Sequence, residues 1–468
     1  MASKIYLAVD IGASSGRHVL GWVEDGKIQT LEVHRFANRL IRKGGHLCWD
    51  IDALYDQVVE GLRRCAAKGK IPDSLGIDAW AVDYCLLDAQ GNRIGDAISY
   101  RDGRTAGIQR RVFERVPAAQ LYARTGIQQM EINTICQLAA VQEQESGLLA
   151  QASRLLMIPD YLHYRLTGVM KQEYTNASTT QLVGACSRDW DWEIVDAMGL
   201  PRRLFGPLGQ PGETVGPLRG ELSRELGFDC MVVLPATHDT ASAVAAAPIE
   251  DRSKAIFLSS GTWSLIGMER VAPDCGERSR AFNFTNEGGV DGTWRYLKNI
   301  MGLWMLQSVR HELGDRYSFE QLSALARQSR IDSAVDAQDP RLLAPESMIG
   351  VLRDMCAESG QKVPHSPGEL ARVIAQSLAA GYQAAVAELE ETIGHAVDCL
   401  HIVGGGSRDD FLNALTARTT GKRIYAGPAE ATALGNLLVQ MLREGEFPDW
   451  QAARAAVGRS IEIRPVVE

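Results

Sequence analysis

Short apolar runs alternate with turn signals at the start of the chain, and this pattern is typical of a strand meander. Five segments are predicted to be strands: Ile5–Asp10, Arg17–Val23, Ile28–Arg35, Ser74–Ala79 and Val82–Leu87. The dipeptide Asp25-Gly26 is a hairpin signal between the second and third of them. Apolar residues recur at three- and four-residue spacings from Leu54 to Cys65, which predicts an amphipathic helix with Asp50 as its N-cap.

The opening pattern returns in the second half of the chain. Lys4–Ala8 leads into the Gly/Ser-rich turn Asp10–Gly16, and Lys254–Leu258 leads into the similar turn Ser259–Thr262, each followed by another apolar strand. A single pair of similar segments, about 250 residues apart, indicates a duplicated domain rather than a short-period repeat array. We therefore expect two domains, residues 1–247 and 248–468, with the boundary at Ala247-Pro248.

The second half ends in a strand–helix–strand pattern. Asp398–Val403 is typical of a buried strand, Gly404–Gly406 is predicted to be a loop, and the spacing of Phe411, Leu412 and Leu415 indicates a helix before the strand Arg423–Tyr425. Upstream, Leu370–Leu389 is predicted to be one long amphipathic helix. Together with the N-terminal pattern, this arrangement predicts an α/β fold.

Composition and charge exclude several classes of protein. Lys and Arg total 49 and Asp and Glu total 58, so the net charge is −9, which disfavours a nucleic-acid-binding protein. No run of 18 apolar residues indicates a membrane span, and the N-terminus lacks the features of a signal peptide. The nine cysteines are odd in number and contain no CxxC pair, so we expect free, buried thiols in a reducing cytoplasm.

The segment Gly12–Gly16 matches the GxSxG pattern of serine hydrolases, with Ser14 as the nucleophile. That motif requires a sharp strand-to-helix turn that exposes the serine. The residues after Gly16 instead predict a strand that ends in the Asp25-Gly26 hairpin. A hydrolase using Ser14 therefore remains an alternative that the local pattern does not favour.

The two Gly/Ser turns are candidates for phosphate binding. Their backbone N–H groups and small hydroxyls suit phosphate oxygens, and Gly12 and Gly261 would allow the backbone to approach a ligand closely. Asp10 ends an apolar strand, where an unpaired carboxylate is costly, and a magnesium ion would supply the missing charge. The alternatives are a plain hairpin at each turn and a turn-capping role for Asp10.

A third candidate element is the segment Leu234–Ala243, in which Asp239 follows a predicted strand and precedes an Ala-rich helix. Asp239 could be a general base that accepts the proton of an attacking hydroxyl. It could equally be the N-cap of the helix, because Asp is favoured at that position. His238, taken alone, is more often structural than catalytic.

Taken in order, these residues resemble the landmarks of the FGGY carbohydrate kinases. The motifs that carry the resemblance are Asp10–Arg17, Ile77–Asp83, Tyr100–Arg104, Tyr174–Thr180, His238–Thr240, Leu258–Trp263 and Gly404–Gly406. The resemblance implies an α/β chain of actin-like ATPase architecture, with two ribonuclease-H-like domains flanking a catalytic cleft. Within the family, Thr285–Gly289 and Lys298–Trp304 resemble the kinases that act on L-rhamnulose.

The resemblance also implies a set of site residues. Asp10 would serve Mg²⁺, and Asp239 would be the proton acceptor. The residues implied to bind ATP are Ala13, Ser14, Ser15, Gly16, Arg17, Thr262, Gln307 and Gly405. The residues implied to meet the ketose are Ala81, His238, Asp239, Thr240 and Asn299.

One motif departs from the family pattern. The family commonly has Trp-Gly-Val-Asp where this chain has Trp80-Ala81-Val82-Asp83, so an extra methyl group would face the sugar. Asp83 could be a sugar ligand or a surface carboxylate on a strand. Arg101 and Arg104 could brace the sugar cleft or pair with acids on the surface.

The expected activity is ATP- and Mg²⁺-dependent phosphorylation of L-rhamnulose to L-rhamnulose 1-phosphate. The alternatives are a kinase for another ketose such as L-fuculose or D-xylulose, a non-catalytic actin-fold ATPase, and the serine hydrolase. The expected partners are the ketose and ATP, with no nucleic acid and no membrane, in a cytoplasmic monomer or homodimer.

Overall fold

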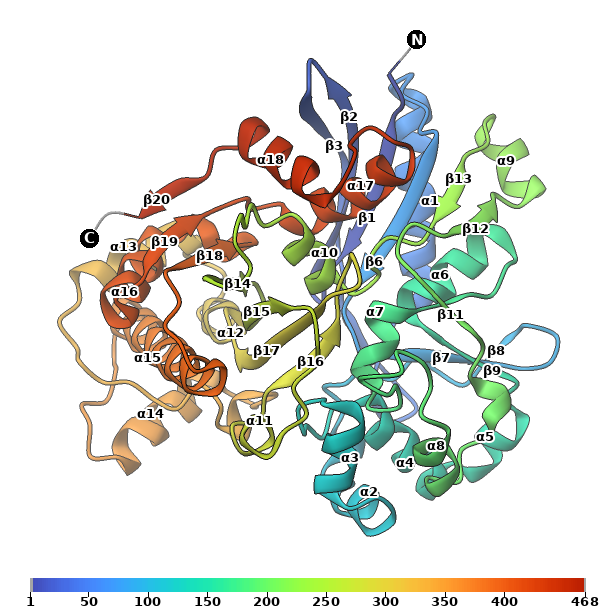
Figure 1. Cartoon of the computed structure of the whole chain (residues 1–468). Helices are drawn as coiled ribbons and strands as arrows, with labels where there is room; N and C mark the ends of the chain where they lie inside the picture. The colour runs from blue at the N-terminus through green and yellow to red at the C-terminus, as the bar shows by residue number, and fades with distance from the viewer. Residues whose placement is uncertain (1–2, 467–468) are drawn as a thin grey trace. The chain divides into compact units, whose positions relative to one another are not determined.

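The N-terminal apolar runs form the middle of a six-stranded sheet in the computed structural model, which describes residues 3–466 (Figure 1). The strand order is β12-β13-β6-β1-β2-β3. β1 pairs antiparallel with β2 and parallel with β6, so the first predicted strand lies between the second one and the predicted strand Ser74–Ala79. The strands are β1 (Tyr6–Ile11), β2 (Ser15–Glu24), β3 (Lys27–Ala37), β6 (Ser74–Ala79), β12 (Thr214–Pro217) and β13 (Met231–Val233).

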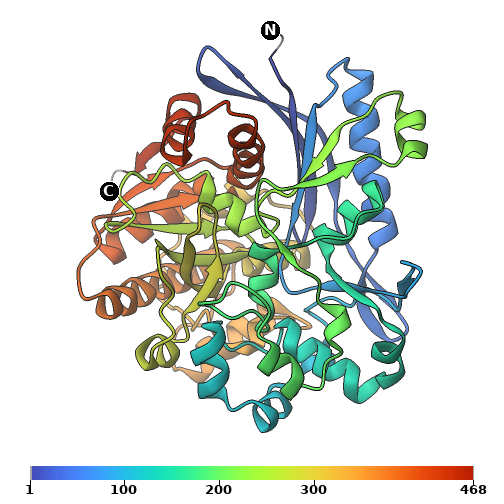
Figure 2. The same cartoon turned by 45° about the vertical axis from the view of Figure 1, so that its right-hand side comes forward.

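The predicted helix after this meander is α1 (Ile51–Ala67), whose N-cap is Asp50 as expected. The Asp50 carboxylate accepts a hydrogen bond from the backbone N–H of Ala53 at 3.1 Å, which satisfies one of the free amides of the first turn. The helix buries its apolar stripe, including Leu54 and Leu62. α1 contacts β3, and the blue helix lies beside the blue strands in both Figure 1 and Figure 2.

Contacts divide the chain into two units that each join distant segments. Unit 1 contains residues 3–246, Arg270–Tyr296 and Ala431–Ser460. Unit 2 contains Ala247–Glu269, Leu297–Glu430 and the described residues after Ser460. The C-terminal helix α17 (Ala431–Arg443) thus belongs to unit 1, where the Gln440 amide donates to the carbonyl oxygen of Leu7 in β1 at 3.0 Å.

A helical region with its own apolar core is inserted between β6 and β12. Its small sheet has the order β8-β7-β9, and its core includes Leu121, Leu138 and Leu155. The further elements of unit 1 are β4 (Leu40–Lys43), β5 (His46–Trp49), β7 (Tyr84–Leu87), β8 (Arg93–Ile94), α2 (Gln109–Arg115), α3 (Ala118–Thr125), α4 (Thr134–Gln144), α5 (Ser146–Gln151), β9 (Arg154–Met157), α6 (Ile158–Thr167), β10 (Gln172–Glu173), α7 (Tyr174–Ala177), α8 (Trp192–Ala197), β11 (Leu208–Gly209), α9 (Gly220–Leu226), α10 (Asp239–Ala245), α11 (Glu277–Ala281), β16 (Thr285–Gly288) and α18 (Trp450–Ser460).

Unit 2 is built around the strands β17-β15-β14-β18-β19-β20, in that order. The unit boundary falls inside β17, after Tyr296. Its elements are β14 (Ala255–Ser260), β15 (Trp263–Arg270), β17 (Trp294–Met301), α12 (Trp304–Glu312), α13 (Phe319–Gln328), α14 (Met348–Glu358), α15 (Pro367–Ile393), β18 (Cys399–Val403), α16 (Asp410–Thr420), β19 (Arg423–Ala426) and β20 (Arg464–Val466). The long predicted helix is α15, which starts at a capping box of Ser366 and Glu369 and ends at Gly394 with a positive φ.

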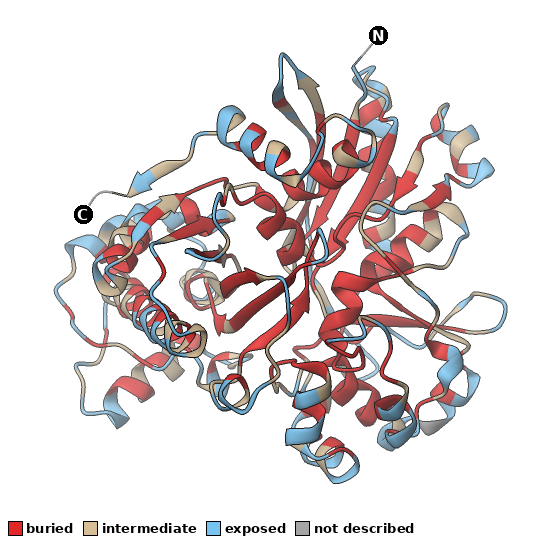
Figure 3. Cartoon of the chain, in the orientation of Figure 1, coloured by how far each residue is buried: buried red, intermediate tan, exposed pale blue. Residues whose placement is uncertain are grey.

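The two sheets share one topology. In each, the first strand pairs antiparallel with the next one in sequence (β1 with β2, β14 with β15) and parallel with a later strand (β6, β18). That later strand pairs parallel with a fourth strand (β13, β19), which has an antiparallel outer neighbour (β12, β20). The shared order is what a duplication predicts, and the α/β class is confirmed. Figure 3 shows the central strands of both sheets coloured as buried.

Three sequence predictions need correction at this level. The predicted strand Val82–Leu87 begins only at Tyr84, because Val82 has a φ of 66° and leaves the extended region. The predicted loop Gly404–Gly406 enters a short 3₁₀ helix, Gly405–Arg408. All nine cysteines are free, as predicted, but Cys186 is exposed and two others are only half-buried, Cys275 and Cys399. No helix among residues 3–466 is long and apolar enough to cross a membrane.

Candidate functional site

The first Gly/Ser turn joins β1 directly to β2. Gly12 N–H donates to the carbonyl oxygen of Ser15 at 2.9 Å, which closes the turn. Asn38 donates to the other two carbonyls, from its backbone N–H to Ser14 and from its side-chain amide to Gly12, each at 3.0 Å. Ser14 is exposed at the tip. A strand rather than a helix follows the turn, so the strand-to-helix geometry of a serine-hydrolase nucleophile is missing here.

Two buried carboxylates lie side by side at the carboxyl ends of β1 and β6. Asp10 and Asp78 are partners in the parallel register of these strands. Arg17, opposite Asp10 in β2, places its Nε 3.4 Å from the Asp10 carboxylate. Asp78 Oδ2 accepts a hydrogen bond from the Asn436 amide at 2.6 Å, whereas the buried Asp78 Oδ1 has no hydrogen-bond partner among residues 3–466. Burial raises the pKa of both carboxyls, and the Asp10 charge raises that of Asp78 further.

Asp239 is the first residue of α10, and the N-cap is His238. The alternative assignment of Asp239 as the N-cap is therefore wrong by one position. The bridge between Ala79 and His238, together with a 2.9 Å hydrogen bond from Ala79 N–H to the Thr237 carbonyl, brings Asp239 to the end of β6. The hydroxyl of Thr240 lies 3.1 Å from Asp239 Oδ1. Burial and then the Asp10 charge raise the pKa of Asp239 to about 7.

A buried carboxylate holds the segment that precedes Asp239. Glu173 Oε2 accepts hydrogen bonds from the hydroxyls of Thr237 and Thr175, both at 2.6 Å, and from Thr237 N–H at 3.2 Å. Thr175 Oγ1 in turn accepts from His238 N–H at 3.3 Å. Because Glu173 is fully buried and bonded on several sides, it fixes the approach of the chain to His238 and Asp239.

His238 contacts a buried arginine that the sequence prediction did not include. Arg295 Nη2 lies 2.9 Å from His238 Nδ1, and Arg295 Nη1 lies 3.0 Å from a carboxylate oxygen of Glu287. Burial and then the Arg295 charge lower the pKa of His238 well below its ordinary value. Glu287 lies within the segment Thr285–Gly289 that resembles the family, so that motif was a signal for it. Arg295 stands between Trp294 and Tyr296 in an apolar strand and gave no such signal.

Asp83 is fully buried, so its assignment as a surface carboxylate is wrong. It accepts hydrogen bonds from four donors in distant parts of unit 1, at 2.6 to 3.1 Å: Trp49 Nε1, Trp80 Nε1, Tyr100 N–H and the Gln137 amide. The rings of the two tryptophans are 4.1 Å apart between centroids. Asp83 therefore organises the motif around Ala81 and holds both indole rings in place.

The turn that carries Ala81 is strained. Asp83 N–H donates to the carbonyl of Ala81 at 2.9 Å across Val82, whose positive φ is unfavourable for a β-branched residue. The Val82 carbonyl accepts hydrogen bonds from the Thr134 hydroxyl at 2.7 Å and from the Gln137 amide at 3.2 Å. Ala81 itself is half-buried at this turn.

The two arginines of the Tyr100–Arg104 motif contact residues around Asp83. Arg104 Nη2 donates to the side-chain oxygen of Gln137 at 2.8 Å. Arg101 is buried, and its guanidinium carbon lies 5.1 Å from the ring centroid of Tyr100. Both arginines therefore belong to the packing around Asp83.

The predicted residues of unit 2 gather around the second Gly/Ser turn, between β14 and β15. Gly261 N–H donates to the Trp263 carbonyl at 2.9 Å, and the Thr262 carbonyl accepts from Trp304 N–H, the first residue of α12, at 3.2 Å. A Cβ on Gly302 would lie 2.5 Å from the carbonyl carbon of Trp263, so only glycine permits this contact. Gln307 follows in α12, while Asn299 lies in β17.

The Gly404–Gly406 loop packs on the same turn. A Cβ on Gly406 would lie 1.9 Å from the Ser260 hydroxyl, and one on Gly404 would lie 3.0 Å from the Ser260 carbonyl oxygen. Gly404 also has a φ of 84°, which favours glycine. Unit 2 thus brings the elements that carry Thr262, Gln307 and Gly405 together.

The sequence profile of the N-terminal domain of the FGGY family of carbohydrate kinases matches residues 5–246, and that of the C-terminal domain matches residues 256–443. This chain belongs to the FGGY family of carbohydrate kinases. The family membership and the site geometry both disfavour the hydrolase alternative.

Curated relatives of this carbohydrate kinase match it along nearly its whole length. A rhamnulokinase of Halalkalibacterium halodurans is 47% identical over 461 residues, which are 98% of this chain and 98% of the relative. A rhamnulokinase of Oceanobacillus iheyensis is 46% identical, covering 98% of this chain and 97% of the relative. A rhamnulokinase of Bacillus subtilis is 44% identical, covering 98% and 94%.

Solved structures confirm the fold of the kinase. A ligand-bound xylulose kinase from Lactobacillus acidophilus superposes with a TM-score of 0.80 at 17% identity, covering 98% of this chain and 93% of that one. Plasmodium falciparum glycerol kinase with ADP gives 0.73 at 14% identity, covering 98% and 94%.

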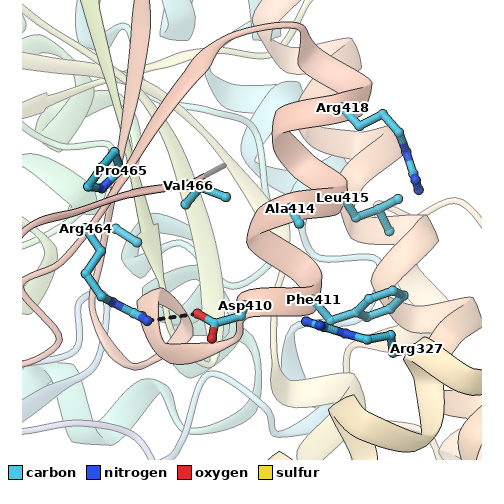
Figure 4. Close-up of a pocket in the computed structure, with 10 residues that line it drawn as sticks. Arg327, Asp410, Phe411, Ala414, Leu415, Arg418, Arg464, Pro465 and Val466 are labelled. Atoms are coloured by element: carbon cyan, nitrogen blue, oxygen red, sulfur yellow. Dashed lines mark hydrogen bonds and ion pairs between the residues drawn. The ribbon is translucent and has the colours of Figure 1, made fainter. Parts of the chain in front are cut away.

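Unit 2 also has a cavity that contains none of the predicted site residues. It has a volume of about 580 Å³ and is lined by Arg327, Asp410, Phe411, Ala414, Leu415, Arg418, Ala426, Arg464, Pro465 and Val466 (Figure 4). The Arg464 guanidinium is bound to the Asp410 carboxylate at 3.0 Å and to the Ser407 carbonyl at 3.0 Å. Because both of these contacts are with residues at or just before the start of α16, Arg464 stabilises the start of this helix.

Proposed function

We propose that this kinase transfers the γ-phosphoryl group of ATP to the 1-hydroxyl of L-rhamnulose and forms L-rhamnulose 1-phosphate. The observation that carries the proposal is the set of curated rhamnulokinases that are 41–47% identical to the chain over nearly their full length. The xylulose kinase structures share only the fold at this level of identity, so they give no support to D-xylulose as the substrate.

Asp239 is proposed to be the base of this reaction. Phosphoryl transfer to a sugar requires a group that accepts the proton of the attacking hydroxyl. A pKa of about 7 leaves a large fraction of Asp239 ionised at neutral pH, while the carboxylate is still basic enough to take a proton. The side chain is 28% exposed, so a ligand can reach it.

Magnesium fits the carboxylate pair of unit 1, and Asp10 is proposed to serve it. Asp78 Oδ1 is buried without a hydrogen-bond partner among the described residues, and both carboxyls have raised pKa values, so a positive charge is missing at this edge. No group of three or more His, Cys, Asp or Glu residues within 3–466 is arranged to hold a metal. Magnesium at a nucleotide site often uses only one or two carboxylates together with phosphates. When bound, it neutralises charge on the phosphates of ATP.

The remaining predicted residues are proposed to divide the two substrates between the domains. Residues 1–247 would bind the sugar and the phosphates, and residues 248–468 would bind the nucleotide. The ATP contacts are assigned to Ala13, Ser14, Ser15, Gly16, Arg17, Thr262, Gln307 and Gly405. The ketose contacts are assigned to Ala81, His238, Asp239, Thr240 and Asn299. The support is that the Gly/Ser turns with Ser14 and Thr262 follow corresponding first strands of the two sheets, β1 and β14.

In the proposed reaction, sugar binding positions the 1-hydroxyl against Asp239, which takes its proton as the phosphoryl group moves. Turn amides around Ser14 and Thr262 would stabilise charge on the phosphate oxygens. Exclusion of water by bound sugar would suppress hydrolysis of ATP. The nine unpaired cysteines support a reducing, cytoplasmic setting.

The test is a panel of ketoses with MgATP, in which ADP release gives the rate and ³¹P NMR gives the product. We expect L-rhamnulose to have the highest kcat/KM, by about tenfold or more over L-fuculose and D-xylulose, because hydrogen-bonding sites discriminate strongly among hydroxyl patterns. A higher kcat/KM for either of the other sugars would contradict the substrate. The absence of any sugar-stimulated ADP release would contradict the kinase and favour a non-catalytic ATPase.

A further inference from the structure

His238 stands between two groups that compete for the same ring nitrogen. Its Nδ1 lies 2.9 Å from Arg295 Nη2 and 3.4 Å from a carboxylate oxygen of Glu287. A guanidinium has only donors, so it requires a lone pair on Nδ1, whereas a carboxylate has only acceptors and would require a proton there. The contact with Arg295 is the shorter of the two, so we expect Nδ1 to be unprotonated and to accept a hydrogen bond from Arg295.

Arg295 cannot turn away from this contact. The residue has no exposed surface, its Nε donates to the Gly288 carbonyl at 2.9 Å, and its Nη1 lies 3.0 Å from Glu287. Three separate directions of the guanidinium are therefore assigned to protein partners. Because the guanidinium is planar and rigid, arginine loses little conformational entropy for each hydrogen bond that it forms in such an arrangement.

We propose that Arg295, anchored by Glu287, is a positioning residue that locks His238 in the tautomer with its proton on Nε2, so that His238 donates a hydrogen bond to an oxygen of the sugar beside Asp239. This inference rests on the proposed function for the identity of the sugar. The tautomer follows from the contacts of the protein alone.

As a consequence, the adjacent side chains of His238 and Asp239 have different roles. His238 Nε2 lies 3.5 Å from Asp239 Oδ1, so the donor and the base face the same place. With Nδ1 occupied by Arg295 and Nε2 protonated, His238 has no lone pair left to accept a proton. Asp239 is then the only proton acceptor of the two, and His238 recognises a sugar oxygen as an acceptor. The lowered pKa of His238 keeps the ring neutral, so only one ring nitrogen is protonated. The tautomer therefore decides which nitrogen can donate a hydrogen bond.

The first test determines the tautomer in the wild-type protein. Imidazole ¹⁵N NMR of the wild-type protein, labelled at histidine and assigned by the loss of one spin system in His238→Gln, reports which nitrogen carries the proton. We expect Nδ1 of His238 to have the shift of an unprotonated nitrogen and Nε2 that of a protonated one. The reverse pattern, or two protonated nitrogens at neutral pH, would overturn the proposal. This result is independent of any kinase activity, so it separates failure of the inference from failure of the proposed function.

The second test replaces Arg295. In Arg295→Met, Glu287 becomes the nearest partner of Nδ1 and should draw the imidazole proton to that nitrogen. Nε2 is then unprotonated and can no longer donate a hydrogen bond to the sugar. We expect the KM for L-rhamnulose to rise about tenfold or more, as for loss of one good hydrogen bond, while the KM for ATP stays within twofold. The matched control is Arg188→Met, because the guanidinium of Arg188 lies 4.8 Å from the ring centroid of neighbouring Trp294 and donates to the carbonyl of Gly292.

The outcomes of the second test are decisive in both directions. A flipped ¹⁵N pattern with a raised ketose KM supports the proposal, and restoration of both by Arg295→Lys would strengthen it, because lysine also only donates. An unchanged ketose KM in a folded Arg295→Met protein with a flipped tautomer would overturn the role in sugar recognition. Equal rises in the ketose and ATP KM values would indicate a structural role and contradict it. If Arg295→Met fails to fold, the ¹⁵N pattern of His238 in the wild-type protein decides the tautomer by itself, and the reverse pattern there overturns the proposal.

Discussion

The two sheets present the same edge with different chemistry. In unit 1 the strand ends carry carboxylates, Asp10 and Asp78 in neighbouring strands, with Asp239 just beyond them. At the equivalent edge of unit 2 the corresponding turn has Ser260, and the loop after β18 has Gly406 packed so closely that no side chain would fit. One topology therefore provides a charged edge suited to chemistry and an uncharged edge at which backbone groups can closely approach a ligand.

The difference shows what burial does to each edge. In unit 1 burial and the charge of Asp10 raise the pKa values of Asp78 and Asp239, so a cation or a proton at this edge is favourable. In unit 2 the contact between Ser260 and the two glycines, Gly404 and Gly406, involves no charged group. It is possible only because glycine has no side chain. Mutations should therefore act through electrostatics at the first edge and through steric fit and hydrogen bonding at the second.

The largest effect is expected from neutralising the charged edge. Asp10→Asn should lower kcat by about 10²–10³-fold, because it removes a preorganised charge from the reacting region. Steady-state ADP release with saturating ketose measures it. Asp56→Asn, on the exposed face of α1, is the matched control and should leave kcat unchanged. A kcat for Asp10→Asn within threefold of the wild type would contradict the assignment.

The pH dependence should follow from the same charges. Because the pKa of Asp239 is raised to about 7, its base form is lost as the pH falls through that value, and kcat/KM should drop about tenfold per pH unit below it. Asp10 is the second cause of the raised pKa, so the acid limb of Asp10→Asn should move to lower pH. A profile that stays flat down to pH 5 would be incompatible with Asp239 as the base.

The uncharged edge should respond more modestly and only toward ATP. Thr262→Val removes a hydroxyl from the turn after β14, and we expect the KM for ATP to rise about tenfold, as for one hydrogen bond to a charged group. The KM for L-rhamnulose should stay within twofold. Thr419→Val, whose hydroxyl is bonded to a backbone carbonyl in α16, is the control. Equal changes for both substrates would contradict a phosphate role at this turn.

The smallest effect is expected where the two units place a residue with positive φ after equivalent strands. Unit 2 has Gly404 at 84° after β18, whereas unit 1 has Val82 at 66° after β6. Val82→Gly should be more stable than Val82→Ala by about 1 kcal/mol, because both variants lose the buried valine side chain but only glycine adopts a positive φ without strain. Gly404→Ala should destabilise the protein. Urea unfolding midpoints measure these differences, and a lower midpoint for Val82→Gly than for Val82→Ala would contradict the strain.

Much of the scaffold was predictable because its signals are local. Short apolar runs located β1 and β6, and the Asp50 cap located the start of α1. The long helix α15 followed from its periodicity. The family motifs indicated candidates such as Thr262 and Gly405 because the motifs occur in order along the chain, and the roles of these residues stay predictions.

What escaped prediction depends on residues that are distant in the sequence. Asp83 is buried because four donors from separate elements converge on it, and strand alternation cannot reveal that. Asp239 is the first residue of α10 rather than its N-cap, and the segment before it is held by hydrogen bonds to Glu173, which lies more than 60 residues earlier. Arg295 stands in an apolar strand, where only the three-dimensional contact with His238 gives it a function.

The most direct test of the account separates binding from transfer in Asp239→Asn. Calorimetric titration of this variant with L-rhamnulose, alongside single-turnover phosphoryl transfer from MgATP, compares the two steps in one protein. We predict a ketose Kd within threefold of the wild type and a transfer rate reduced by about 10²–10⁴-fold, the usual contribution of a general base. Near-wild-type transfer would contradict the central claim that the charged edge of unit 1 performs the chemistry.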